Sequence, residues 1–204
     1  MKPAVSSIVF FLLLALVSNT KPSLGTEVVL NMAGSRVQEG ALYRIESADK
    51  RFGGVNGLAV NGSCSPLLVY QSGAGDGEGL TGFALANHPE NPDPAYIPYV
   101  PLSTDLDIIF PPPIKTRVPD PCTSIRKWKI SFDKQEKQYF VVSAEGEGRS
   151  GWFRIEKFGS SYFFRFCRSK MVCRNVGIYT TNGLRRLALA KVPLMVRFSG
   201  GFVV

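Results

Sequence analysis

Side chains that could carry catalytic chemistry are scarce in this sequence. His88 is the single histidine, and it stands beside Pro89. A catalytic triad or a histidine-containing metal site needs partners that a lone histidine does not have. The four cysteines include no Cys-x-x-Cys pair, the spacing that zinc sites favour. The sequence therefore predicts a protein that is not an enzyme and that holds neither a metal nor a cofactor.

A proline-rich segment is the feature that most needs an explanation. The stretch NPDPAYIPYVP, residues 91 to 101, has four prolines in eleven positions and places Tyr96 and Ile97 between two of them. Proline fixes φ near about −65° and biases the preceding residue toward extended backbone. Two interpretations stay open. The segment is either a stiff loop that presents an exposed aromatic side chain, or a long solvent-facing connection that its prolines keep ordered and resistant to proteolysis.

The amino-terminal residues have the pattern of a secretory leader. Lys2 precedes the apolar stretch IVFFLLLALV at residues 8 to 17, and the expected cleavage site Ser23-Leu24-Gly25, with small residues at 23 and 25, follows. Ten apolar residues are too few to cross a hydrocarbon layer of about 30 Å, so we interpret residues 1–25 as a signal peptide and not as an anchor. The mature protein, residues 26–204, is then expected to be secreted or vacuolar, with no membrane partner, as one domain and a monomer.

All four cysteines follow this leader, in an expected oxidising compartment, so two disulfides are predicted. Four cysteines allow three pairings. Cys167 and Cys173 are six positions apart, which suits a local bridge and leaves Cys64 and Cys122 to close a long loop.

Charge is divided along the chain. The formal charge of +8 falls to +6 without the leader, and no lysine or arginine lies between Phe52 and Ile114, where six acidic residues lie. A nucleic-acid-binding protein gathers its basic residues on one element together with aromatic residues. The basic residues here surround the acidic stretch, so we predict solvated loops and strand faces and no nucleic-acid partner.

The periodicity indicates short strands and no convincing amphipathic helix. Turn-bounded runs rich in β-branched or aromatic residues predict strands at 106–110, 138–144, 161–167 and 185–190. Asn56-Gly57, Asn61-Gly62 and Asn182-Gly183 are the pairs that type I′ hairpin turns prefer. These features predict an all-β barrel or sandwich.

An aromatic-basic-isoleucine pattern recurs at residues 43–45, 128–130 and 153–155, at unequal spacings that alone do not establish a threefold repeat. Trp128 and Trp152 are expected in the core or at the closure of a barrel. Asn61-Gly62-Ser63 is a sequon for N-glycosylation, and an unmodified turn is the alternative.

Taken in order, the motifs resemble those of plant Kunitz inhibitors of the soybean trypsin inhibitor type. The segment at 28–45 resembles the amino-terminal signature of that family, with a glycine at 34 and with Val37, Tyr43 and Ile45 in place. The other matching segments are FGGVNGLAV, CSPLLVYQ, STDLDIIF, GWFRIEKFGSSYFFRFC, VGIY and NGLRRLALA. The resemblance runs from about Val28 to Phe198.

The resemblance implies a β-trefoil of twelve strands in three pseudo-repeats, with six strands in a barrel and six capping it. It also implies disulfides from Cys64 to Cys122 and from Cys167 to Cys173. Members of the family typically block a serine endopeptidase with a loop that binds as a substrate would. Such a loop must be extended before binding, because freezing a loose loop costs about 1 to 2 kcal/mol per residue.

By this resemblance the reactive loop is Pro94, Ala95, Tyr96, Ile97, Pro98 and Tyr99, with Tyr96 at the specificity position and Ile97 as its scissile partner. A tyrosine suits an apolar pocket such as that of chymotrypsin, whereas the buried carboxylate of trypsin favours lysine or arginine. Glu39 occupies the place of the asparagine that braces the loop in typical members. Pro98 has no N–H to donate to the enzyme. Asn31 stands where the signature prefers aspartate.

The alternatives to this function are a non-inhibitory defence, storage or ligand-binding trefoil, or an inhibitor of cysteine or aspartic proteases that acts through another loop. The basic segment at 168–172, inside the short disulfide loop, is an exposed candidate for a second contact.

Overall fold

The computed structural model of this chain describes residues 27–60, 62–75, 80–85, 99–110, 124–146, 152–169 and 172–202. For residues 64, 80–85 and 201–202 it describes the backbone alone. No helix in these ranges is long and apolar enough to cross a membrane.

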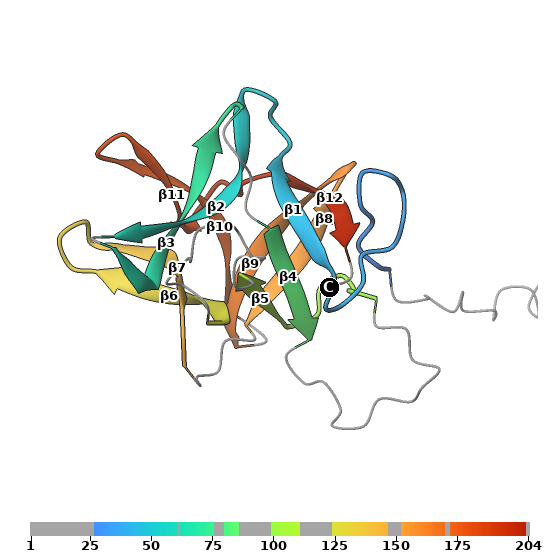
Figure 1. The fold of residues 1–204 in the computed structure, drawn as a ribbon, viewed down its shortest axis with the longest axis horizontal. Coiled ribbons are helices and arrows are strands. Elements are labelled where there is room, and N and C mark those ends of the chain that lie inside the picture. Colours follow the sequence, from blue (N-terminus) through green and yellow to red (C-terminus); the bar gives the residue numbers. More distant parts are fainter. Residues whose placement is uncertain are drawn as a thin grey trace, which may run out of the picture.

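The described part of the chain forms twelve β-strands, coloured in chain order in Figure 1. Their bounds are β1 Leu42–Ser47, β2 Phe52–Val60, β3 Ser63–Gly73, β4 Leu80–Leu85, β5 Leu106–Phe110, β6 Arg126–Asp133, β7 Gln138–Ala144, β8 Phe153–Phe158, β9 Ser161–Ser169, β10 Val172–Thr181, β11 Leu184–Ala190 and β12 Val196–Phe202. The four strands predicted from the sequence coincide with β5 and β7 and lie within β9 and β11. The all-β prediction is confirmed.

Six of the strands close into a ring. Going round it, β1 pairs with β4, β4 with β5, β5 with β8, β8 with β9, β9 with β12, and β12 returns to β1, all antiparallel. A closed ring has no open edge whose backbone groups would be left without partners. This ring is the barrel of the fold.

The other six strands form three hairpins, β2–β3, β6–β7 and β10–β11. The hairpins also pair with one another, through β3 with β7, β7 with β11, and β11 with β3. Figure 1 shows them gathered on the side of the molecule away from β1, β4 and β12. Four consecutive strands, two from the barrel around one hairpin, therefore recur three times, and the predicted β-trefoil is confirmed.

Trp128, in β6, fills the centre of the barrel and has no exposed surface. Its ring lies 5.7 Å from Phe153 and 5.2 Å from Phe164, both edge-on, and 6.4 Å from Phe110. Edge-to-face contacts at these distances add to the stabilisation that burial provides. These partners come from β5, β8 and β9, so one side chain from a capping hairpin joins three barrel strands.

The sequence predicts Trp152 in the core or at the closure of the barrel. This residue precedes β8, is only partly buried, and packs against Phe166 at 5.8 Å. Its carbonyl accepts a hydrogen bond from Cys167 N at 2.7 Å, so Trp152 lies at the end of the β8–β9 pair and not in the fully buried core.

Two of the three Asn-Gly pairs mark the hairpin turns as predicted. Asn182 and Gly183 have φ of 49° and 75° and connect β10 to β11. The second pair falls between β2 and β3, with Gly62 at φ 73°, although Asn61 itself lies outside the described residues. Positive φ is what a type I′ turn requires.

The prediction for Asn56-Gly57 is wrong, because this pair lies inside β2, opposite Tyr70 and Val69. At this position the small size of Gly57 matters for side-chain packing, and no turn forms. A Cβ at this position would lie 3.0 Å from Leu67 Cδ1, so a larger residue would require the Leu67 side chain to shift.

The recurring aromatic-basic-isoleucine pattern falls on β1 of the first repeat and on β6 and β8, which both belong to the second repeat. It therefore does not mark the threefold symmetry. Its aromatic residues Tyr43, Trp128 and Phe153 are all buried, so the pattern reflects the inward and outward alternation of strand residues.

Cys167 and Cys173 form the predicted short disulfide, with their Cα atoms 4.1 Å apart on the paired strands β9 and β10. The predicted bridge from Cys64 lies outside the described residues, because Cys122 and the side chain of Cys64 are not among them.

We predict that Trp128→Ala lowers the free energy of unfolding by about 3 to 5 kcal/mol, because it leaves a large cavity among three aromatic rings. Urea unfolding followed by circular dichroism measures the change. Trp152→Ala is the matched control and should cost clearly less. Equal losses for the two variants would contradict the central role of Trp128.

Candidate functional site

Most of the predicted reactive loop, Pro94 to Pro98, lies outside the described residues, which resume at Tyr99. The structure does describe where the chain leaves and re-enters the trefoil. It leaves at Leu85, the last residue of β4, which is paired with Leu106 of β5. It re-enters at Tyr99, which is paired with Gln38. The predicted loop therefore belongs to the connection between β4 and β5.

The returning segment, residues 99–102, is bound to the amino-terminal segment through its main chain. Val29 N donates to Val100 O at 2.9 Å, and Val100 N donates to Val37 O at 2.9 Å. Leu102 N donates to the carbonyl oxygen of Glu27 at 2.8 Å. The side chains of Val29, Val37 and Val100 are buried. The downstream end of the loop is therefore fixed as firmly as a strand in a sheet.

The turn that reaches this segment is shaped by Asn31. Its Oδ1 accepts hydrogen bonds from the backbone N–H groups of Ala33 and Ser35, at 3.0 and 2.9 Å. Its Nδ2 donates to Gly200 O at 3.2 Å, on β12. An aspartate could accept the first two bonds but could not donate the third. This explains why asparagine serves at a position where aspartate was expected.

Tyr99 is the one predicted loop residue that the structure describes. The guanidinium carbon of Arg36 lies 4.9 Å from the centre of its ring, which is within cation–π range. Gln38, the bridge partner of Tyr99, donates its N–H to the hydroxyl of Tyr43 at 3.0 Å. Tyr99 is thus held both by its backbone and by its ring. Sequence reasoning missed Arg36, because the contact joins residues 63 positions apart.

Glu39 follows Gln38 immediately, and its Oε2 atom is buried. It is therefore next to the point where the loop returns, as its predicted supporting role requires. Support of the loop by Glu39 stays a prediction, because Pro94 to Pro98 lie outside the described residues.

The next residues are tied to β8. Ser103 N donates to Ile155 O at 2.9 Å, and its hydroxyl donates to Glu156 at 2.6 Å. Arg154 donates through Nε to Asp105 at 2.6 Å, and this hydrogen bond raises the pKa of the guanidinium. The segment from 99 to 105 is thus held from two sides before β5 begins.

Strand pairing also explains the lengthwise division of charge. Asp105 pairs with Arg154, and Asp107 pairs with Lys127 at 2.6 Å. Both acidic residues come from the stretch that lacks lysine and arginine, and both partners come from the basic part of the chain. Among the described residues, acidic and basic segments therefore neutralise each other across neighbouring strands.

Two further predicted positions are described only in part. Asn61 of the sequon lies outside the described residues, although the turn around it is where it was expected. In the segment at 168–172, Arg168 and Val172 are described, and Val172 is 62% exposed. No group of three or more histidine, cysteine, aspartate or glutamate side chains in the described ranges could hold a metal ion.

A trefoil barrel that fixes the foot of the connection between its fourth and fifth strands is a scaffold on which such a connection can be anchored. Comparison with known proteins agrees. A family model described as trypsin and protease inhibitor, the legume Kunitz family, matches residues 29–199. The chain belongs to this family.

Two curated relatives are similar in sequence. Kunitz trypsin inhibitor 5 of Arabidopsis thaliana is 38% identical over 115 residues, which are 50% of this chain and 53% of that protein. This match therefore spans about half of the relative. Miraculin of Synsepalum dulcificum is 32% identical over 191 residues, covering 84% of this chain and 82% of that protein.

Among solved structures, soybean trypsin inhibitor in complex with porcine pancreatic trypsin superposes with a TM-score of 0.66 at 26% identity. The match covers 85% of this chain and 98% of that one.

We predict that Val100→Ala lowers the free energy of unfolding by about 2 kcal/mol, because it removes two buried carbon groups from the anchor of the loop. Denaturant titration measures the loss. Val172→Ala, at an exposed position, is the matched control and should change stability by less than about 0.5 kcal/mol. A neutral Val100→Ala variant would show that the anchor contributes little.

Proposed function

We propose that this protein is a secreted or vacuolar, non-enzymatic inhibitor that blocks a chymotrypsin-like serine endopeptidase with the loop from Pro94 to Tyr99. Tyr96 enters the main specificity pocket of the enzyme, and Ile97 follows on the leaving side. The observation that carries this proposal is the anchor of the returning segment. Residues 99–102 are hydrogen-bonded to Val29, Val37 and Glu27 in the free protein.

The anchor matters because inhibition in this mode depends on low reorganisation on binding. Each residue that is ordered only on the enzyme costs about 1 to 2 kcal/mol. A loop whose downstream end is already fixed avoids that cost for its last residues. Pro94 and Pro98 restrict φ at the positions that flank the proposed contact, which reduces the cost further.

The family and its solved member support a protease as the partner. Soybean trypsin inhibitor, at 26% identity, is bound to trypsin in the matching complex. For this chain the loop chemistry favours a different specificity. Between Phe52 and Ile114 there is no lysine or arginine to meet the carboxylate in a trypsin pocket. Tyr96 offers an aromatic ring for an apolar pocket instead.

Tyr96→Ala should weaken inhibition of chymotrypsin by about 2 to 4 kcal/mol, or about 30- to 1,000-fold, because the ring is the main buried anchor. Titration of the purified mature protein against chymotrypsin measures this, with trypsin expected to be little affected. Tyr139→Ala is the matched control, since Tyr139 is exposed on the β6–β7 hairpin.

Unchanged potency of Tyr96→Ala would move the contact to another loop. A panel that includes cysteine and aspartic proteases would then find it. Failure of the wild-type protein to inhibit any of these enzymes would favour a storage or ligand-binding role.

Pro98→Ala should tighten binding to chymotrypsin. The substitution restores an N–H that substrate-like inhibitors donate to a buried enzyme carbonyl. Without this hydrogen bond the complex loses about 1 to 3 kcal/mol of binding free energy. Loss of the proline constraint offsets about 0.4 to 1 kcal/mol of this gain. The inhibition constant measures the difference, with Pro92→Ala as the control outside the proposed contact. An unchanged constant would mean that the loop register is wrong.

A further inference from the structure

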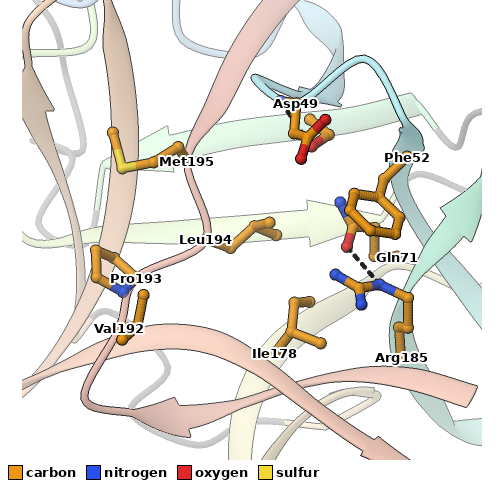
Figure 2. Close-up of a pocket in the computed structure, with 10 residues that line it drawn as sticks. Asp49, Phe52, Gln71, Ile178, Arg185, Val192, Pro193, Leu194 and Met195 are labelled. Carbon is orange, nitrogen blue, oxygen red and sulfur yellow. Dashed lines mark hydrogen bonds between the residues drawn. The ribbon is translucent and has the colours of Figure 1, made fainter.

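A cavity of about 290 Å³ lies among the capping strands, formed by residues that the loop does not use. Its walls come from the turn between β1 and β2, from β3, from the β10–β11 hairpin and from the connection between β11 and β12. Figure 2 shows Gln71 and Arg185 on one side of this space and Leu194, Pro193 and Met195 on the other. The cavity is thus polar on one wall and apolar on the opposite wall.

The apolar wall is held rigidly. Leu194 N donates to Val176 O at 2.9 Å, and Met195 O accepts from Ala48 N at 2.8 Å. Gly177 lets this connection approach closely, since a Cβ there would lie 2.1 Å from Val192 O. The wall is therefore formed before any ligand arrives, as small-molecule sites usually are.

Gln71 supplies the strongest indication of a ligand. The residue is only 3% exposed, and its Oε1 accepts a hydrogen bond from Arg185 Nε at 2.9 Å. Because Arg185 can only donate, the amide oxygen must face it and the amide nitrogen must point elsewhere. Within the described residues, Nε2 of Gln71 has no hydrogen-bond partner. A buried amide donor without an acceptor costs stability unless something else satisfies it.

Arg185 supplies further donors beside that amide. Its guanidinium lies over the Phe52 ring, 3.8 Å from the ring centre, and it is oriented by the bond from Nε to Gln71. Nη1 and Nη2 donate to no acceptor in the described part of the chain. A guanidinium fixed by stacking and by one hydrogen bond can bind a carboxylate with little loss of side-chain freedom.

The remaining acidic group on the cavity is already paired. Arg51 donates to both carboxylate oxygens of Asp49, at distances from 2.7 to 3.1 Å, and these hydrogen bonds lower the pKa of Asp49 to about 2. Asp49 and Arg185 are the two charged residues that line the cavity. Because the carboxylate of Asp49 is already hydrogen-bonded to Arg51, the guanidinium of Arg185 is the charged group that a ligand could engage. The site favours an anion over a neutral molecule or a cation.

We propose that this cavity binds a small organic monocarboxylate with an apolar body. The carboxylate accepts from Gln71 Nε2 and from the Nη groups of Arg185, and the body packs on Ile178, Leu194 and Met195. A sugar fits less well, because Arg185 already covers a face of Phe52, the aromatic ring on which a sugar would stack.

Phenylacetate is the probe, because it combines one carboxylate with an apolar ring. Isothermal titration on the full mature protein should show one site with a dissociation constant of about 1 mM or tighter. In NMR spectra the side-chain amide of Gln71 and the methyl groups of Ile178, Leu194 and Met195 should shift. Phenylacetamide has the same shape without the charge and should bind at least about tenfold more weakly.

Arg185→Gln should weaken phenylacetate binding by about tenfold or more, because it removes a charged donor. Arg174→Gln, on the same hairpin but outside the cavity, removes an equal charge and should leave the affinity within about twofold. Gln71→Met removes the buried donor and should also weaken binding. Thermal unfolding of each variant checks that it is folded. If Gln71→Met does not fold, the affinity of Arg185→Gln for phenylacetate tests the proposal.

Three results would overturn the proposal. The first is no detectable binding at a phenylacetate concentration about ten times the expected dissociation constant. The second is equal affinity for phenylacetate and phenylacetamide. The third is a set of NMR shifts confined to residues outside the cavity. Tighter binding of a neutral sugar such as glucose at the same residues would assign the cavity to carbohydrate instead. None of these results depends on whether the Tyr96 loop inhibits a protease.

Discussion

Closure of the six-stranded ring is the constraint on which the rest of this structure depends. The ring closes around a shared core, and Trp128 contributes to it from outside the ring, since β6 belongs to a capping hairpin and its ring contacts aromatic residues of three barrel strands. Burial of one large side chain therefore couples the barrel to its cap. Val29, Val37 and Val100, which lie outside the strands, pack into the same core.

The amino-terminal segment before β1 makes backbone hydrogen bonds that hold the β4–β5 connection and do not close the barrel itself. Val28 and Gln38 make isolated bridges with Pro101 and Tyr99, and Met32 N donates to Phe198 O of β12 at 2.8 Å. The hydrogen bonds to residues 99–102 hold the foot of the β4–β5 connection, and Asn31 links the same turn to β12. A segment more than 60 residues away in sequence thus fixes residues 99–102, where the described chain resumes after β4.

The sequence predicted the class of fold well, for reasons that are local. Short alternating strands and the Asn182-Gly183 turn depend on neighbours in the chain, and the short disulfide depends on a spacing of six residues. The Asn56-Gly57 turn prediction is wrong because both residues pair with β3, opposite Tyr70 and Val69, inside a strand. Trp152 is only partly buried because it precedes the buried Phe153, and successive residues along a strand face opposite sides.

The candidate site was less predictable, since its supports are non-local. Arg36 over Tyr99 and the main-chain bonds of Val100 join segments more than 60 residues apart. No periodicity or motif carries that information. Gln71 and Arg185 were not singled out at all, because neither lies in a motif and their interaction spans 114 positions. Resemblance to a family supplied the register of the loop, and the structure supplied the reason its downstream end is fixed.

The loop and the cavity use one scaffold in two independent ways. The foot of the loop is held by main-chain hydrogen bonds to residues 27–38, whereas the cavity lies among the turn at 47–52, the β10–β11 hairpin and the connection at 191–195. The two regions share no described hydrogen bond or salt bridge. Substitutions at sites without shared partners add independently. A change at Arg185 should therefore leave the anchor of residues 99–102 intact, because the two sets of described residues have no hydrogen bond or salt bridge in common.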